Sequence, residues 1–326
     1  MQPHQLNPQI EPQFEQVNDF IINHLGSNVP LVEKIGHYIV QSGGKRFRPL
    51  LVLLASNACN YPHSEAQQDH IKLAATIEFI HTATLLHDDV VDNSDLRRGK
   101  DTANAKWGNA PSVLVGDFLY SRAFQIMVEI GKLEIMDVIS NATNVIAEGE
   151  VLQLLNSRNP DLSEEDYMKV IIGKTAMLFE AATESGAILA GAPSAERQAL
   201  KDYGRHLGIA FQLIDDVMDY LSSAEEMGKN TGDDLAEGKA TLPLIQAMKE
   251  STPENRKLIR RAIREGGLED LAPVLEAVMS TNAIQYTQQQ AQQQSQLAID
   301  SLAAIQESSF KETLVALAKL AVQRTS

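Results

Sequence analysis

The spacing of apolar residues is the feature that most restricts how this chain can fold, because the spacing is helical almost throughout. Apolar side chains recur at intervals of three and four positions in four long segments, at residues 31–40, 71–92, 111–130 and 203–221. The sequence has no convincing run of the strict alternation that indicates a β-strand. It therefore predicts an all-α chain with on the order of ten helices or more, several of them long enough to cross the domain.

Glycine, proline and charged clusters interrupt the helical pattern, but none of them reads as a linker between domains. Ser163, with Asp166 three positions later, is typical of a helix start. The glutamine-rich residues 287–302 favour a helix with a polar solvent face. We expect one domain over residues 1–326, with residues 1–12 disordered. Breaks are expected at Gly43–Gly44, Tyr61–Pro62, residues 93–100, Gly131, Asn159–Pro160, Ala192–Pro193 and residues 228–241.

Composition excludes several classes of protein. The chain has 326 residues and a formal net charge of −15, so it should repel nucleic acid and anionic membrane surfaces. Its single cysteine, Cys59, rules out a disulfide framework and a cysteine-rich zinc site, which suits a reducing cytoplasm. The N-terminus lacks the pattern of a signal peptide, and the longest apolar run, residues 49–59, is too short to span a bilayer. We therefore expect a cytoplasmic protein without a transmembrane segment or a nucleic-acid partner.

Two matching acidic motifs each close a long apolar segment. The first is DDVVD from Asp88 to Asp92, and the second is DDVMD from Asp215 to Asp219. Positions i and i+4 share one face of a helix, so each motif stacks its first and last carboxylates. Stacked carboxylates repel each other unless a cation lies between them.

Oxygen ligands of this kind suit Mg²⁺, which keeps part of its water shell and commonly bridges to phosphates. Asp89 and Asp216 lie about 100° around the helix from their neighbours. A solvated helix end explains one such motif as well as a metal site does, but two copies favour magnesium. A di-iron bundle is the rival interpretation, because Glu78 and His81 form a Glu-x-x-His motif. Such a site needs that motif twice, and no other histidine has a glutamate three positions before it.

Cations accompany both acidic motifs. Lys45, Arg46 and Arg48 follow the two glycines at 43 and 44, where a flexible turn and a helix N-terminus make an anion cradle. Cations and magnesium-binding carboxylates in one cleft indicate a ligand that carries a polyphosphate. The apolar helices beneath indicate that its other end is a hydrocarbon. The remaining basic residues of interest are Arg97 and Arg98 after the first motif, Lys174 beside Thr175 within a helical segment, and Lys229 and Lys239 around the loop after the second motif.

Six segments in order resemble the trans-isoprenyl (polyprenyl) diphosphate synthases, and among them the bacterial octaprenyl diphosphate synthases of quinone side-chain biosynthesis. They lie within residues 40–245, and residues 147–154 (AEGEVLQL) add to the likeness. One departure is Ala240, where the family often has proline. The segments are GGKRFRP, LLHDDVVDNSDLRRG, GDFLYSRAF, GKTAMLFEAA, FQLIDDVMDY and GKNTGDDLAEGKATLPL.

The resemblance implies a fold, a cofactor and a role for each motif residue. The fold would be a single-domain isoprenoid-synthase-type helical bundle with a central deep cavity, assembled as a homodimer. Mg²⁺ on the allylic diphosphate would be bound by Asp88, Asp92 and Asp215, supported by Asp89, Asp216 and Asp219. The same diphosphate would be held by Arg97, Lys174, Lys229 and Lys239. Isopentenyl diphosphate would be held by Lys45, Arg48, His81 and Arg98. Beside the reacting carbons would lie Thr175 and Gln212.

Product length depends on what the growing tail meets. One turn before Asp88 the chain has Ala83 and Thr84, where family members that stop at C15 carry aromatic residues. Small side chains there predict a long product, because a helix of about 20 residues spans about 30 Å. Phe124 and Met127 are candidates for the floor of the cavity, although ordinary core packing explains them equally well. The preference for C40 over C30 or C45 rests on the resemblance.

Two other functions remain open at this stage. A terpene cyclase could use the same scaffold, but it needs no second diphosphate site such as GGKRFRP. A non-catalytic subunit of a heteromeric synthase should tolerate loss of the second acidic motif, which is intact here. We therefore expect a magnesium-dependent enzyme that extends an allylic diphosphate, such as farnesyl diphosphate, with isopentenyl diphosphate.

Overall fold

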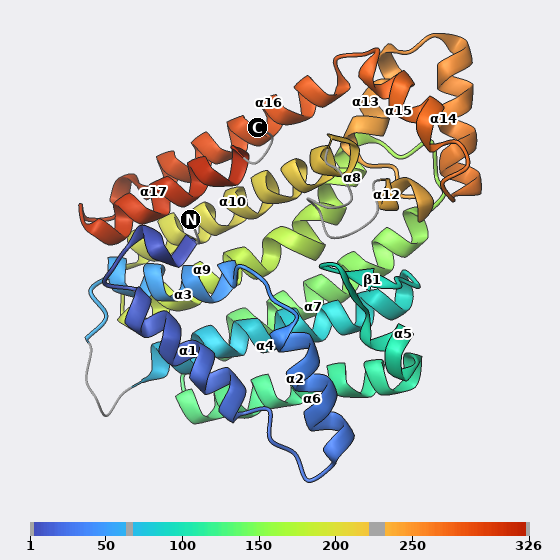
Figure 1. The fold of residues 1–326 in the computed structure, drawn as a ribbon. Coiled ribbons are helices and arrows are strands. Elements are labelled where there is room, and N and C mark those ends of the chain that lie inside the picture. Colours follow the sequence, from blue (N-terminus) through green and yellow to red (C-terminus); the bar gives the residue numbers. More distant parts are fainter. Residues whose placement is uncertain (1–2, 63–67, 222–231, 324–326) are drawn as a thin grey trace. The chain divides into compact units, whose positions relative to one another are not determined.

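The computed structural model describes residues 3–62, 68–221 and 232–323, and over these residues the predicted all-α class is confirmed (Figure 1). The first half contains η1 (Pro3–Leu6), α1 (Glu11–Asn23), α2 (Pro30–Gln41), α3 (Phe47–Ala58), α4 (Asp69–Val91), β1 (Leu96–Arg97), β2 (Lys100–Asp101), α5 (Ala103–Trp107), α6 (Asn109–Ile130) and α7 (Leu133–Asn156). The second half contains α8 (Glu164–Ile171), η2 (Ile172–Ala176), α9 (Met177–Ala190), α10 (Ser194–Leu221), α12 (Asp233–Ala236), α13 (Leu242–Glu250), α14 (Pro253–Glu265), α15 (Leu271–Met279), α16 (Ala283–Ser301), η3 (Leu302–Ala304) and α17 (Ser309–Val322).

The chain forms two compact units, each assembled from separate stretches of sequence. Unit 1 comprises Met1–Ala142, Leu178–Gly204 and Ser301–Leu317. Unit 2 comprises Thr143–Met177, Arg205–Asp300 and Ala318–Ser326. The single domain predicted for residues 1–326 stays a prediction.

The centre of unit 1 is the packing of α4 along α6, with α3 and α1 also against α4 (Figure 1). Phe79, Ile80 and Ala83 of α4 are fully buried, as is Leu119 of α6. Gly116 of α6 permits close approach, because a Cβ there would lie 2.3 Å from Nε2 of His87. This contact places the last turns of α4 firmly against α6.

The N-terminal segment has tertiary contacts that the sequence did not indicate. Asn7 donates from Nδ2 to the carbonyl of Ser309 at 3.2 Å and to the hydroxyl of Thr313 at 3.1 Å. Ile10, just before α1, is fully buried. Residues 3–10 are therefore held by α17, a partner about 300 positions away that local sequence cannot reveal.

A two-stranded ribbon interrupts the helices where the sequence predicted only a break. Leu96 pairs with Asp101 and Arg97 pairs with Lys100 in antiparallel register. The two residues between the strands, Arg98 and Gly99, have φ of 54° and 73°. Positive φ at both positions is the pattern of the tight turn that matches the strand twist, and glycine adopts it without strain.

Unit 2 has a core formed by α13, α14 and α15, in which Leu244, Ile259 and Val278 are fully buried. The predicted glutamine-rich helix is present as α16, and Ala291 is buried in it while Leu297 is exposed. The predicted helix start at Ser163 is also confirmed, since its hydroxyl accepts from the Asp166 amide. Among the described residues, no helix combines the length and the apolar character needed to cross a membrane.

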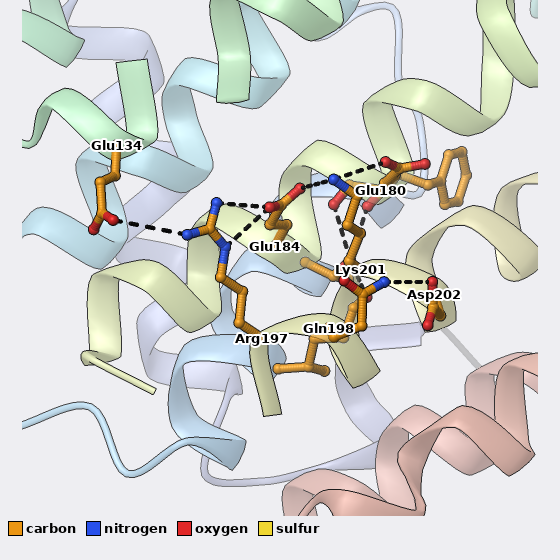
Figure 2. A network of polar contacts seen from close by, with 10 residues as sticks. Glu134, Glu180, Glu184, Arg197, Gln198, Lys201 and Asp202 are labelled. Carbon is orange, nitrogen blue, oxygen red and sulfur yellow. Dashed lines mark hydrogen bonds and ion pairs between the residues drawn. The ribbon is translucent and has the colours of Figure 1, made fainter. Parts of the chain in front are cut away.

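A network of charges joins α9 to the first turns of α10 in unit 1 (Figure 2). Arg197 donates from Nε and Nη2 to Oε1 of Glu184, at 3.0 and 2.8 Å. Lys201 lies 3.1 Å from Oε2 of Glu184 and 3.5 Å from Oε1 of Glu180. Both glutamates are buried, so each needs these cations to offset the cost of removing a carboxylate from water.

Replacing Arg197 tests this network. Arg197→Met should lower the free energy of unfolding by about 1–3 kcal/mol, because Glu184 would keep Lys201 but lose two charged hydrogen bonds in a buried position. Gln198→Ala is the matched control, since Gln198 bonds Asp202 at the surface (Figure 2), and it should cost less than about 0.5 kcal/mol. Urea denaturation measures both changes, and equal effects of the two substitutions would contradict a stabilising role for the network.

Candidate active site

The first acidic motif stands at the C-terminal end of α4. The helix continues to Val91, and the amide of Asp92 donates to the carbonyl of Asp88 at 2.8 Å. The C-terminal end of a helix carries a partial negative charge, so carboxylates there are unfavourable without nearby cations. Asp88 and Asp92 are half-buried and Asp89 is fully buried.

Arg97 supplies one of these cations. Its Nε and Nη2 lie 2.8 and 2.7 Å from Oδ1 of Asp89. Burial raises the pKa of Asp89, the Arg97 pair lowers it in part, and Asp88 and Asp92 raise it further. Oδ2 of Asp89 is buried and has no hydrogen-bond partner among the described residues. The ribbon thus holds Arg97 on the acidic motif, and the motif still favours additional positive charge.

A second group of cations lies around the start of α3, which begins at Phe47. Arg48 contacts His81 of α4, with Nη1 and Nε2 3.2 Å apart, and its guanidinium lies 4.5 Å from the ring centroid of Phe179. The pKa of His81 is well below its ordinary value. Burial is the largest cause, and the positive charges of Arg48 and of other arginines lower the pKa further. The neutral imidazole therefore accepts a hydrogen bond from Arg48, whose pKa burial lowers to about 10.

Gly44 brings Arg98 to the same place. A Cβ at Gly44 would lie 2.6 Å from Nη1 of Arg98, so the guanidinium lies directly against the Gly44 backbone and a larger residue there would make it shift. Lys45 follows in the loop and is exposed. Glu78 lies one turn before His81. Burial raises the pKa of its carboxyl group, and the positive charges of Arg48 and Arg98 oppose that rise. Arg48, His81 and Arg98 are thus brought together in unit 1.

The second acidic motif occupies the last turns of α10 in unit 2. Asp215 is half-buried, whereas Asp216 and Asp219 are buried. Oδ2 of Asp219 accepts from the amide of Asp234 at 3.3 Å, which ties the motif to α12. Lys239, just after α12, pairs with Glu237. The predicted diphosphate ligand Lys229 lies outside the described residues.

Lys174 and Thr175 lie on η2, a π-helical turn between α8 and α9 that the sequence did not predict. Such turns insert one extra residue into a helix and are frequent at functional sites. Lys174 pairs with Glu150 of α7, with Nζ and Oε2 2.7 Å apart. Glu150 was not among the predicted site residues, although it belongs to the segment AEGEVLQL that resembled the family.

The π turn packs directly on the backbone of α7. A Cβ at Gly149 would lie 2.8 Å from the amide nitrogen of Lys174 and 3.0 Å from the carbonyl carbon of Gly173. The Cα of Gly149 would lie 3.5 Å from a Cβ at Gly173. Two glycines therefore allow two backbones to meet, and their contact sets the position of Lys174 and Thr175.

Thr175 begins a chain of hydrogen bonds within unit 2. Its hydroxyl donates to Oε1 of Gln212 at 2.8 Å, and Nε2 of Gln212 donates to Oδ1 of Asp216 at 2.7 Å. The hydroxyl of Tyr167 donates to Oδ2 of Asp216. No sequence signal pointed to Tyr167, which reads as an ordinary apolar position of α8.

The four residues predicted to control product length lie on α4 and α6, the two helices that pack along each other in unit 1. Ala83 and Met127 are buried, and Thr84 and Phe124 are half-buried. The hydroxyl of Thr84 donates to the carbonyl of His81 at 2.8 Å, so it needs no other partner. A small side chain with a satisfied hydroxyl is compatible with a neighbouring hydrocarbon.

The donors around the acidic motifs fit a hard divalent cation. Across residues 3–62, 68–221 and 232–323, no three His, Cys, Asp or Glu side chains converge enough to hold a metal ion by themselves. Mg²⁺ does not require such a cluster, because it is commonly held by one or two carboxylates together with waters and phosphate oxygens. Stacked aspartates at the end of α4 offer that kind of incomplete, oxygen-only set.

Comparison with known proteins identifies the family. The polyprenyl synthetase family model matches residues 29–281. The chain is 54% identical to octaprenyl diphosphate synthase of Escherichia coli over 94% of each chain. It is 47% identical to an all-trans-nonaprenyl-diphosphate synthase of Rhodobacter capsulatus described as geranyl-diphosphate specific, over 95% of this chain and 94% of that one. A crystal structure of a Caulobacter crescentus polyprenyl synthase with calcium and isoprenyl diphosphate matches with a TM-score of 0.94 and 43% identity, over 98% of this chain and 97% of the other. The chain therefore belongs to the polyprenyl synthetase family and is a prenyltransferase.

Gly149→Ala tests the positioning of η2. The added methyl would meet the backbone of Lys174, which cannot move without displacing Lys174 and Thr175, so the turnover number should fall at least tenfold, corresponding to about 1.4 kcal/mol or more. Gly26→Ala is the control, because a Cβ there meets nothing within 4 Å. Steady-state kinetics of prenyl transfer would show a normal turnover number for Gly149→Ala if the backbone contact were unimportant.

Proposed function

We propose that this protein is a Mg²⁺-dependent trans-prenyltransferase that adds isopentenyl diphosphate units to farnesyl diphosphate and releases all-trans octaprenyl diphosphate. One observation carries the proposal. Within unit 1, an anion site made by Arg48, His81 and Arg98 accompanies a carboxylate motif that carries its own arginine, Arg97. The first group can bind a diphosphate directly through its positive charges. The carboxylate motif can bind a second diphosphate through Mg²⁺.

The proposed roles follow the resemblance residue by residue. Mg²⁺ on the allylic diphosphate is held by Asp88, Asp92 and Asp215, supported by Asp89, Asp216 and Asp219. That diphosphate is also held by Arg97, Lys174, Lys229 and Lys239. Isopentenyl diphosphate is held by Lys45, Arg48, His81 and Arg98. In the free protein Glu150 is the counter-ion of Lys174, and the allylic diphosphate would compete for that lysine.

The chemistry is an ionisation followed by an alkylation. When bound, Mg²⁺ neutralises the charge that builds up on the leaving diphosphate. Arg97 and Lys174 add fixed positive charge to the same oxygens as the C1–O bond breaks. Thr175 and Gln212 offer oxygen dipoles to the allylic cation without being strong nucleophiles. The double bond of isopentenyl diphosphate then forms a bond to C1, and a proton leaves to the departing pyrophosphate. The product is again an allylic diphosphate, so the cycle repeats.

Product length is proposed from α4 and from the relatives. Ala83 and Thr84 are too small to block a tail near the acidic motif, which supports a long chain. Octaprenyl (C40) is favoured because the octaprenyl diphosphate synthases of Escherichia coli and Haemophilus influenzae are 54% and 49% identical to this chain. A nonaprenyl synthase at 47% identity keeps a C45 product as an alternative, beside C30. A role as a non-catalytic subunit is the remaining alternative.

The setting of the reaction is also part of the proposal. The product would supply the side chain of a quinone, the enzyme would work in the cytoplasm, and it would form a homodimer. Exposed apolar side chains on α6 support the dimer, since Leu114 and Val128 are 65% and 66% exposed. An isolated chain gains nothing from large apolar side chains in water, whereas a second copy would bury them.

The direct test is a product assay. Purified protein is incubated with Mg²⁺, farnesyl diphosphate and labelled isopentenyl diphosphate, and the dephosphorylated products are separated by length. A dominant C40 product supports the proposal, and incorporation should disappear with a metal chelator and in Asp88→Asn. A folded protein that incorporates no label would instead favour the non-catalytic subunit.

Thr84→Phe tests the control of length. An aromatic ring one turn before Asp88 should obstruct the tail, so the main product should shift from long chains towards C15–C20 while label is still incorporated. Thr84→Val is the matched control, because it removes only the hydroxyl that bonds His81, and its product should keep the original length. An unchanged product length in Thr84→Phe would contradict the assignment of Ala83 and Thr84 to the control of product length.

Charge on α6 tests the homodimer. Leu114→Lys combined with Val128→Lys should convert a dimer to monomers, because two buried ammonium groups per protomer would each cost several kcal/mol in an apolar interface, on the order of the penalty for an unpaired buried charge. Gln292→Lys with Gln293→Lys adds the same charge on the exposed face of α16 and should leave the dimer intact. Light scattering after gel filtration gives the mass, and a double lysine variant of α6 that stays dimeric would exclude this face.

A further inference from the structure

We propose that Tyr167 and Asp216 are positioning residues that fix the orientation of the Gln212 amide, so that the hydroxyl of Thr175 presents only its oxygen lone pairs to the reacting allylic carbons. The inference rests on the proposed function, in which Thr175 and Gln212 lie beside those carbons. It gives Tyr167 a role, and it gives Asp216 a role distinct from binding Mg²⁺.

The geometry is a continuous line of hydrogen bonds across three elements of unit 2. Tyr167 of α8 and Gln212 of α10 donate to different oxygens of Asp216, and Gln212 Nε2 lies 2.7 Å from Oδ1. The other end of the amide, Oε1, accepts from the hydroxyl of Thr175 on η2 at 2.8 Å. Tyr167 and Asp216 are 4% and 2% exposed, so water cannot readily replace either partner.

The direction of each bond is set by what each group can do. Nε2 of Gln212 donates to Oδ1 of Asp216, which turns Oε1 of the same amide towards the hydroxyl of Thr175. The phenol hydrogen of Tyr167 goes to Oδ2 of Asp216, which leaves Oδ1 of that carboxyl group for the amide of Gln212. Thr175 has one hydroxyl hydrogen, and it is used on Gln212.

The consequence for the substrate is electrostatic. With its hydrogen directed to Gln212, the Thr175 oxygen can offer only lone pairs, which stabilise a developing positive charge. If the amide turned round, its NH₂ group would donate to Thr175 and release the hydroxyl hydrogen. That hydrogen would turn the positive end of the dipole outward and oppose ionisation. Preorganised dipoles of this kind act on the transition state more than on binding.

The test uses single variants of the full-length protein, and one double variant, with Mg²⁺, farnesyl diphosphate and isopentenyl diphosphate. Tyr167→Phe removes one donor from Asp216, and Asp216→Asn replaces an acceptor with an amide that can also donate. Tyr220→Phe is the matched control, because Tyr220 is a buried tyrosine of the same unit whose hydroxyl lies near Thr241 at 3.3 Å and not on this chain of bonds. Single-turnover rates, KM for both substrates and the Mg²⁺ concentration for half-maximal rate are measured for each.

The expected result is a split between chemistry and binding. Tyr167→Phe should lower the single-turnover rate about tenfold, a barrier increase of about 1.4 kcal/mol, and Asp216→Asn should lower it further. In Tyr167→Phe, both KM values and the Mg²⁺ requirement should stay within about twofold of the unaltered protein, and Tyr220→Phe should behave like the unaltered protein. In a Gln212→Leu background, Tyr167→Phe should have no further effect, because the residues act through one amide.

Other results overturn the inference in distinguishable ways. An unchanged rate at saturating Mg²⁺ in Asp216→Asn, with only the Mg²⁺ requirement raised, would limit Asp216 to the support of Mg²⁺ and exclude the positioning role. Equal, additive losses in the Gln212→Leu background would make Tyr167 merely structural. If the unaltered protein transfers no prenyl group, the proposed function fails first and the inference fails with it. If Tyr167→Phe does not fold, the same measurements on the near-isosteric Asp216→Asn test the inference.

Discussion

Compensation of charge at the ends of helices is the constraint on which this structure depends. The first acidic motif stands where α4 ends, at the negative end of the helix dipole, and it needs cations to be stable there. The protein supplies Arg97 to Asp89 and leaves Asp88 and Asp92 half-buried. The ribbon reverses the direction of the chain at that point. Its Arg98–Gly99 turn also places the guanidinium of Arg98 against the backbone of Gly44. One short turn therefore positions a cation at the acidic motif and another at the proposed isopentenyl diphosphate site.

Close contact between backbones provides the second layer of organisation. In unit 2, Gly149 and Gly173 let α7 meet the π turn, and that turn sets where Lys174 and Thr175 stand. The side chains are then held by an ion pair and a hydrogen bond: Glu150 pairs with Lys174, and Gln212 accepts from Thr175. In the proposed reaction, side chains that are held in place before the substrate binds would reduce the cost of reorganisation.

The sequence predicted the helices and the acidic motifs because those depend on local spacing. The stacking of Asp88 with Asp92 follows from a period of 3.6 residues, and the helix start at Ser163 follows from its own hydroxyl. Contacts between distant segments could not be predicted in this way. The π turn arises where Gly173 meets Gly149, and Tyr167 gains its role only from Asp216 on another helix. The proposed roles of the lysine and arginine side chains came from the resemblance to the family, because the spacing of these residues alone does not indicate which diphosphate each one binds.

The two-diphosphate account is tested most directly by measuring the Mg²⁺ dependence of binding for each substrate separately. Calorimetry would compare isopentenyl diphosphate with an unreactive thio-diphosphate analogue of farnesyl diphosphate, with and without Mg²⁺. The account predicts that the farnesyl analogue binds only with Mg²⁺ and loses affinity in Asp88→Asn, while isopentenyl diphosphate binds without the metal and loses affinity in Arg48→Met. Equal Mg²⁺ dependence for both ligands, or loss of both in either variant, would contradict two sites of different character.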